Sequence, residues 1–225
     1  MRAAHLAGLL LALACAAPSP EPPRAASEPS TPASPRMVKL VFRSRSPGVD
    51  AASPAGQPRT LYRVGRGYGR LEHPPDPEKG TRMLVIVNEP HTWVIDLERG
   101  VGQYGRDPGP TYFFHAPVLP PPAGPDSLRS LEFGREFEFL GAHGAQPTRT
   151  VEADGSEAER YEVSFEPFKL VVLAIPGSEV PRALRIFDGA ELVAAWDYDS
   201  YERDLDPDPA LFRPPEGVRI FKRSK

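Results

Sequence analysis

Histidine, serine, cysteine and carboxylate side chains are the usual agents of nucleophilic and acid–base catalysis. The histidines His73, His91, His115 and His143 lie far apart, without the H-x-H or H-E-x-x-H spacing of a metal site. No G-x-S-x-G sequence occurs that would place a serine nucleophile on a tight turn. The pattern predicts that the protein is not an enzyme and has no catalytic residue. A dispersed Ser/His/Asp set is the one route to a hydrolase that stays open.

A run of acidic residues near the C-terminus has the oxygen ligands that calcium prefers: Asp197, Asp199, Glu202, Asp204, Asp206 and Asp208. An EF-hand loop needs glycine at its sixth position and glutamate at its twelfth. Counting from Asp204 gives Pro209 and Pro215, and counting from Asp197 gives Glu202 and Asp208. We therefore predict no metal and no cofactor, and interpret the run as an acidic edge strand or loop, since charge discourages edge pairing. A calcium site of another kind than the EF-hand is the alternative.

Residues 65–69 read GRGYG and lie among arginines. Their spacing is G-x-G-x-G rather than G-x-G-x-x-G, and no helix is predicted after them, so nucleotide binding is not indicated. Arg63, Arg66 and Arg70 alternate with tyrosines, a pattern that also occurs on strands that bind nucleic acid. The chain carries a net charge of −3, however. We interpret these arginines as a solvated strand face and predict no nucleic-acid partner.

The single cysteine, Cys15, ends a segment typical of an export signal. Residues 1–14 begin with a charge at Arg2 and continue with an uncharged, leucine-rich stretch, which is too short to cross a hydrocarbon core of ~30 Å. Residues 12–15, ALAC, resemble the lipobox of bacterial lipoproteins, in which the cysteine is lipidated and becomes the mature N-terminus. The resemblance implies that Cys15 is a lipid anchor. Residues 12–14 also suit ordinary signal peptidase, so secretion without an anchor is the alternative.

Residues 15–36 have the composition of a tether. Seven of the 21 residues in 16–36 are proline and none is large and apolar, so the segment favours extended polyproline II and cannot bury a core. Ala16, rather than aspartate, follows the cysteine. By resemblance to proteobacterial lipoproteins, this implies a location on the periplasmic side of the outer membrane. We predict a signal peptide in 1–14 and a lipid-anchored tether in 15–36.

The remaining residues, 37–225, are predicted to form one β-rich domain. Proline makes up 29 of the 225 residues, and an interior proline costs a helix ~3 kcal/mol, so long helices are disfavoured. Only residues 126–131 suggest a helical turn, with Asp126 as its cap. Ten segments bounded by turn residues show strand patterns: 37–45, 61–71, 82–88, 91–97, 131–140, 160–166, 168–175, 182–187, 191–198 and 218–222.

The clearest alternation lies in residues 131–140, LEFGREFEFL. Its apolar residues share one side and its glutamates the other: Leu131, Phe133, Phe137 and Phe139 against Glu132, Glu136 and Glu138. We therefore predict a strand with a buried aromatic side and an acidic side in solvent.

Two segments resemble the LolA/LolB-like family of periplasmic proteins that sort lipoproteins. In residues 62–104 a strand with Arg66, Tyr68 and Arg70 is followed by LVIVNEPHTWVIDLERGVGQY, and residues 211–218, LFRPPEGV, are similar to the ending of that family. The resemblance implies a mainly β fold, an unclosed antiparallel β-barrel or strongly curved sheet with little helix and a concave apolar face. It also implies non-covalent binding of acyl chains or lipidated proteins.

These inferences together predict an anchored envelope lipoprotein that binds a hydrophobic ligand, in lipid or lipoprotein trafficking or in envelope homeostasis. Residues 112–119, apolar but rich in turn formers, are the predicted lid. The alternative is a structural or adaptor lipoprotein that binds a protein partner and whose aromatic rings pack on one another. Candidates to line the ligand cavity are the inward aromatic residues Trp93, Phe133, Phe137, Phe139, Tyr161, Phe165 and Trp196.

Overall fold

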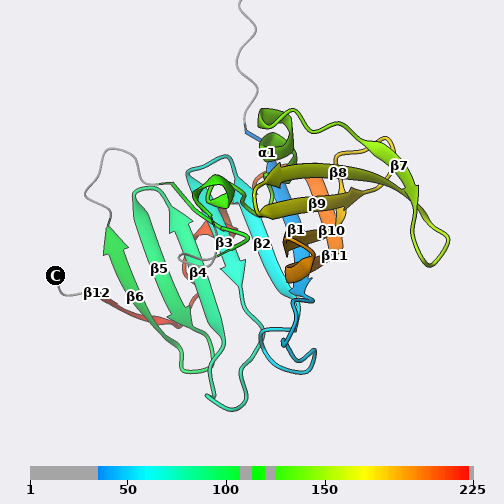
Figure 1. Ribbon diagram of the computed structural model, residues 1–225. Helices are drawn as coiled ribbons and strands as arrows, with labels where there is room; N and C mark the ends of the chain where they lie inside the picture. The colour runs from blue at the N-terminus through cyan, green and yellow to red at the C-terminus, as the bar shows by residue number, and fades with distance from the viewer. Residues whose placement is uncertain (1–34, 107–112, 120–124, 223–225) are drawn as a thin grey trace, which may run out of the picture. The chain divides into compact units, whose positions relative to one another are not determined.

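The computed structural model describes residues 35–106, 113–119 and 125–222. The described residues form one sheet of 12 strands in the order β12-β6-β5-β4-β3-β2-β1-β11-β10-β9-β8-β7. β12 and β7 end the sheet without closing it, and Figure 1 shows how strongly it curves. The predicted mainly β, unclosed and curved sheet with little helix is confirmed. The predicted signal peptide, Cys15 and nearly all of the tether lie outside the described residues.

Neighbouring strands of the sheet are antiparallel, except that β12 pairs with β6 in parallel. The long strand β11 joins the two halves, because it pairs with both β1 and β10. The strands are β1 Met37–Ser44, β2 Arg59–Val64, β3 Tyr68–Glu72, β4 Met83–Asn88, β5 His91–Asp96, β6 Val101–Arg106, β7 Thr148–Val151, β8 Glu157–Phe165, β9 Phe168–Ala174, β10 Pro181–Asp188, β11 Glu191–Leu205 and β12 Arg219–Lys222.

Turn chemistry accounts for most of the strand boundaries. The predicted hairpins at residues 89–90 and 188–189 are confirmed as the β4–β5 and β10–β11 turns. The segment 61–71, predicted as one strand, is instead the β2–β3 hairpin. Gly65 in its turn has a φ of +53°, which glycine adopts without the steric cost that a side chain would add. The predicted solvated strand face is therefore wrong for two of its arginines, because Arg66 lies at a hairpin tip and Arg63 is buried.

The strand predicted over residues 131–140 is wrong. Gly134, with a φ of +80°, ends the extended part of this segment, and helix α1, Glu136–Ala142, follows it. The buried residues of α1 are spaced as a helix requires, and an Arg135–Glu138 ion pair supports its first turn. The predicted helical turn at 126–131 is reduced to a 3₁₀ turn, η1 Asp126–Leu128, without a side-chain cap.

The glutamates of the same segment were predicted to face solvent, and two of them do not. Glu132 is 3% exposed and Glu136 is 0% exposed. Both lie against the face of the sheet that we call the helix-bearing face. It carries the larger core, in which Leu40, Leu61 and Leu184 pack against Phe114, Leu131, Phe133 and Leu140 of the connection that holds η1 and α1.

The other side of the sheet, the opposite face, has a smaller core over β2 to β5. Leu84, Ile86 and Ile95 alternate with helix-bearing positions and pack against Phe212 in a second 3₁₀ turn, η2 Pro209–Phe212. Asn88 Nδ2 donates a hydrogen bond of 3.2 Å to the Phe212 carbonyl oxygen. The C-terminal segment thus covers part of this face.

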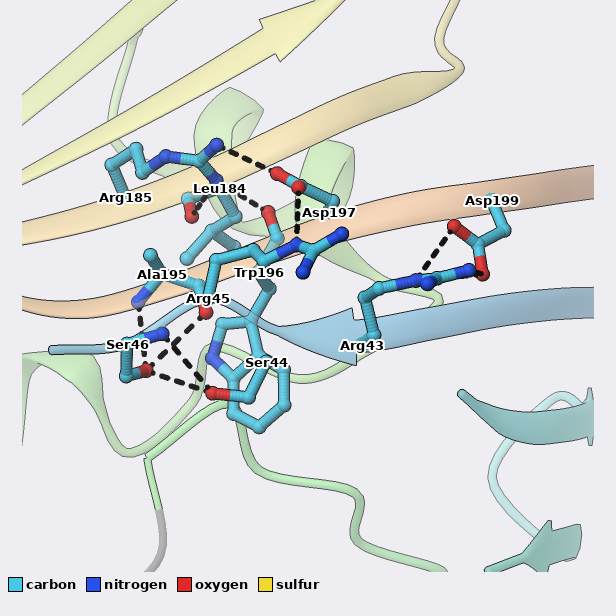
Figure 2. A network of polar contacts seen from close by, with 10 residues as sticks. All are labelled: Arg43, Ser44, Arg45, Ser46, Leu184, Arg185, Ala195, Trp196, Asp197 and Asp199. Atoms are coloured by element: carbon cyan, nitrogen blue, oxygen red, sulfur yellow. Dashed lines mark hydrogen bonds and ion pairs between the residues drawn. The ribbon is translucent and has the colours of Figure 1, made fainter. Parts of the chain in front are cut away.

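The acidic run does not form an edge or loop at its start, which corrects that prediction. Both Asp197 and Asp199 belong to β11; Asp197 has β1 on one side and β10 on the other, and the pairing with β10 ends there, so Asp199 lies beside β1 alone. Figure 2 shows their carboxylates beside Arg43, Arg45 and Arg185. Within residues 35–106, 113–119 and 125–222, no group of three or more His, Cys, Asp or Glu side chains is placed to hold a metal ion. In the same ranges no helix has the length and apolar character needed to span a bilayer.

Candidate functional site

A hollow of about 580 Å³ lies beside α1, and we call it the α1 groove. Its volume falls within the ~300–1,000 Å³ range typical of small-molecule sites. Three pieces of chain form it: the β2–β3 turn, residues 113–115 and residues 129–143. Its lining residues are Arg66, Phe113, Phe114, His115, Arg129, Ser130, Glu132, Arg135, Glu138, Phe139, Ala142 and His143.

The α1 groove combines an aromatic wall with a charged rim. Phe114 and Phe139 are buried in the core below it, and Phe113 is exposed. Three arginines face the hollow. Arg135 Nε donates to Glu138 Oε2 at 2.9 Å, and Arg129 is ion-paired with Asp126. Such a combination suits a molecule that has both an apolar and a polar part.

Arg66 differs from the other rim arginines. Its guanidinium carbon lies 5.4 Å from the centre of the Phe113 ring, within the range of a cation–π interaction. Within the described part of the chain, no carboxylate forms an ion pair with it. The side chain is exposed at the hairpin tip, so its N–H groups are available to a ligand.

A buried ionic network fixes the floor of the groove. Arg63 of β2 forms an ion pair with Glu132, and both side chains are almost fully buried. Its guanidinium also donates to the carbonyl oxygens of Phe133 at 2.7 Å and Phe114 at 2.9 Å. Arg63 therefore holds two separate pieces of the connection against the sheet.

Glu132 is kept ionised by its partners. Burial opposes ionisation, but the charge of Arg63 and hydrogen bonds from Arg63 and His115 lower the pKa of the carboxyl below its usual value of 4.5. Its second oxygen lies 2.8 Å from His115 Nδ1, and a carboxylate can only accept, so the imidazole donates. His115 is thereby oriented at the edge of the groove with its other ring nitrogen unclaimed by this bond.

Three groove residues have the types found in a hydrolase triad: Ser130, His115 and Glu132. The base and its orienting carboxylate are in contact, as a triad requires. No hydrogen bond joins Ser130 to His115 among the residues that the structure describes. Glu132 is also engaged by Arg63, which gives the carboxylate a structural role. The geometry contains an oriented histidine without an activated nucleophile.

A second buried carboxyl, Glu136, begins α1. Its oxygens accept hydrogen bonds from Tyr198 Oη at 2.7 Å, Tyr201 Oη at 3.2 Å and the Gly134 amide at 2.9 Å. No ion pair reaches it in the described ranges. Burial raises the pKa of Glu136 above its usual value, and these hydrogen bonds offset only part of that effect. Burial also raises the pKa values of Tyr198 and Tyr201.

The structure brings six of the seven candidate cavity residues into one cluster on the helix-bearing face. There they contact one another. The ring of Phe133 lies edge-on to that of Trp196, with 5.1 Å between the ring centres, and the ring of Phe137 lies edge-on to that of Tyr161, with 5.4 Å between the ring centres. Of the seven candidates, Phe139 is the one that also lines the α1 groove; its ring centre lies 6.0 Å from that of Phe165. Trp93 lies apart, beside Tyr104 on the opposite face.

Most of the residues that line the groove were absent from the predicted site. In the predicted lid, Phe114, Ala116 and Val118 are buried in the core, so this segment is part of the packed connection; Tyr112 lies outside the described residues. One signal for the network was present in the sequence. Arg63 shares the alternation of Leu61, so an arginine occupies an inward strand position, which calls for a buried partner.

No family model and no curated protein matches the sequence. Among solved structures, an uncharacterized conserved protein from Thermus thermophilus is similar, with 9% identity and a TM-score of 0.47 over 84% of this chain and 91% of that one. LolA superfamily protein NE2245 from Nitrosomonas europaea has 11% identity and a TM-score of 0.33 over 82% and 92%. MucB, in complex with MucA(peri), has 10% identity and a TM-score of 0.40, with 83% of this chain matched to 57% of MucB.

These likenesses concern the arrangement of strands and assign no residue and no ligand. No family model assigns the chain to the LolA superfamily.

Proposed function

We propose that the protein is a non-enzymatic binding protein that takes the apolar part of a ligand into the α1 groove. The observation that carries the proposal is a hollow of about 580 Å³ bordered by Phe113, Phe114 and Phe139 and rimmed by arginines. Most of the other inward aromatic rings pack on one another, so the groove is the better place for a ligand than the aromatic cluster. An acyl chain or the lipid of a lipidated protein has the required chemistry.

The cellular setting belongs to the same proposal. Export through residues 1–14 and acylation of Cys15 would place the domain on the periplasmic side of the outer membrane. There it would act in lipid or lipoprotein trafficking or in envelope homeostasis. Replacing Cys15 by serine is expected to release the protein from the membrane fraction and abolish fatty-acid labelling. Unchanged fractionation of the variant would contradict the anchor.

The binding proposal is tested with the full chain carrying Cys15→Ser and a fluorescent acyl probe. Saturable binding is expected, and Ala142→Trp, which adds a large ring at an exposed position of the groove, is expected to weaken it. Ala190→Trp is the matched control, since Ala190 lies exposed in the β10–β11 turn. Absence of saturable binding, with no lipid found by native mass spectrometry, would favour the adaptor alternative.

The non-enzymatic part has its own test. The protein is expected to hydrolyse activated acyl esters no faster than buffer, and Ser130→Ala is expected to leave that rate unchanged. Turnover that disappears in Ser130→Ala and in His115→Asn would identify a hydrolase and overturn this part of the proposal.

A further inference from the structure

The rim of the α1 groove carries positive charge that the carboxylates of the groove do not fully neutralise. Arg66, Arg129 and Arg135 line it together with two glutamates. One of these, Glu132, is already paired with Arg63 beneath the groove. Arg135 is paired with Glu138, and the Asp126 partner of Arg129 is exposed to solvent. Arg66 forms no ion pair within the described part of the chain, although its charge is among those that lower the pKa of Glu138.

The position of Arg66 is suited to an anion. A guanidinium lying over an aromatic face keeps its N–H groups at the ring edge, where they can form a paired contact with a carboxylate or phosphate. The Phe113 ring below it is 37% exposed and belongs to the same groove. A ligand that contacts both would place its charged end on Arg66 and its apolar part along the phenylalanines.

His115 borders the same rim and is held in place. Its side chain is 64% exposed, while its partner Glu132 is nearly buried and is itself fixed by Arg63. The imidazole is therefore held in one orientation at the edge of the groove, and its second ring nitrogen takes no part in the bond to Glu132. It is a second polar contact for the charged end of a ligand.

We propose that the α1 groove selects amphiphiles with an anionic headgroup, a carboxylate or a phosphate, and that Arg66 is the residue that determines this selectivity. The inference rests on the proposed function, because it names the class of ligand for the same groove. The shared chemistry is that of any small oxyanion, so free phosphate is tested beside the amphiphile.

The experiment compares monomeric dodecyl phosphate with a neutral dodecyl glycoside of the same chain length, on the full chain carrying Cys15→Ser. Calorimetry is expected to show about tenfold tighter binding of the phosphate, the effect of one charge-assisted hydrogen bond. The preference should fall as salt rises, because the contact is exposed. Arg66→Gln should abolish this preference by weakening the binding of dodecyl phosphate far more than that of the glycoside, and Arg66→Lys should retain part of the preference.

Arg149→Gln is the matched control, an exposed arginine on β7 that forms no ion pair with the described residues and lies outside the α1 groove. It should keep the preference. Equal binding of both amphiphiles would overturn the headgroup inference and leave the proposed function standing. Binding of neither would overturn both. Inorganic phosphate that binds as tightly as dodecyl phosphate, with no binding of the glycoside, would identify a free-anion site and overturn the selection of amphiphiles.

Discussion

Glu132 and Glu136 lie four residues apart, on the two sides of the turn at Gly134, and both are buried against the helix-bearing face. Their surroundings differ. Glu132 faces the guanidinium of Arg63, which keeps the carboxyl ionised. Glu136 faces two tyrosine hydroxyls and an amide, and burial pushes it toward its protonated form.

The comparison shows that burial does not decide the charge of a carboxyl; the partner does. An ion pair in the interior depends on both members, since removal of one leaves an uncompensated charge. A carboxyl held by hydroxyl groups has no such dependence, because hydroxyls can both donate and accept. The turn before α1 is therefore held on one side by the ion pair of Glu132, which should be sensitive to mutation of either member. On the other side it is held by the hydrogen bonds of Glu136, which should tolerate loss of one partner.

The largest expected effect is that of Glu132→Gln. The substitution leaves Arg63 buried without a countercharge, and breaking a buried pair in this way costs about 3–5 kcal/mol. The free energy of unfolding from urea denaturation measures it. Replacing both Arg63 and Glu132 by methionine should recover part of the loss, because no charge is then buried, although the carbonyl oxygens of Phe133 and Phe114 lose their donor. A loss below about 1 kcal/mol in the single variant would contradict the ionic network.

A smaller effect is expected for Tyr198→Phe. The ring still packs, but the hydroxyl that donates to Glu136 Oε1 is lost. A hydrogen bond of this kind contributes about 0.5–1.5 kcal/mol, and Glu136 keeps its contacts to Tyr201 and the Gly134 amide. Urea denaturation compares the variant with the parent chain. Tyr62→Phe, on the opposite face, is the control, because no hydrogen bond of its hydroxyl joins it to the described residues.

The effect of Glu136→Gln should depend on pH. Because the pKa of Glu136 lies above 4.5 in the folded protein, its contribution to stability is complete below pH 4.5 and is lost as the pH rises through the raised value. The amide resembles the protonated acid and does not ionise. The variant should therefore match the parent to within about 1 kcal/mol at low pH and gain relative stability as the pH rises.

Glu132 should show the reverse trend, because its pKa lies below 4.5 in the folded protein. Its contribution is present above pH 4.5 and is lost as the pH falls through the lowered value. Urea denaturation of both Gln variants over a pH series separates the two. Parallel curves for Glu136→Gln and the parent chain would show that Glu136 does not titrate differently in the folded and unfolded states.

The sequence predicted the strands well where an apolar or alternating segment borders a turn signal, as at residues 82–97 and 182–198. The prediction failed at residues 131–140, since phenylalanine and glutamate in that order fit a helix as well as a strand. The positive φ of Gly134 ends the extended backbone there, and the helix follows. The buried acids were missed for another reason. Their partners lie 69 residues away in Arg63 and 62 residues away in Tyr198, so no local pattern reveals them.

The candidate site was only partly predictable for the same reason. The aromatic candidates were chosen for size and direction, and the structure uses most of them to fill the core. The groove depends instead on the hairpin tip at Arg66 meeting residues 113–143, a tertiary arrangement that brings together pieces separated by tens of residues.

The smallest expected effect concerns the ion pairs of the opposite face, which extend the comparison to exposed carboxylates. Asp199 accepts from Arg43 Nε at 3.0 Å across the β1–β11 pair, in a geometry as direct as that of Arg63 and Glu132 (Figure 2). Both side chains are about a third exposed, so water already solvates them and little is gained by pairing. Asp199→Asn should therefore cost less than about 1 kcal/mol, and added salt should reduce the difference further. The cost of Glu132→Gln should persist in the same salt, because solvent does not reach that pair. A salt-insensitive cost above about 2 kcal/mol for Asp199→Asn would show that pairing geometry, rather than burial, sets the value of these ion pairs.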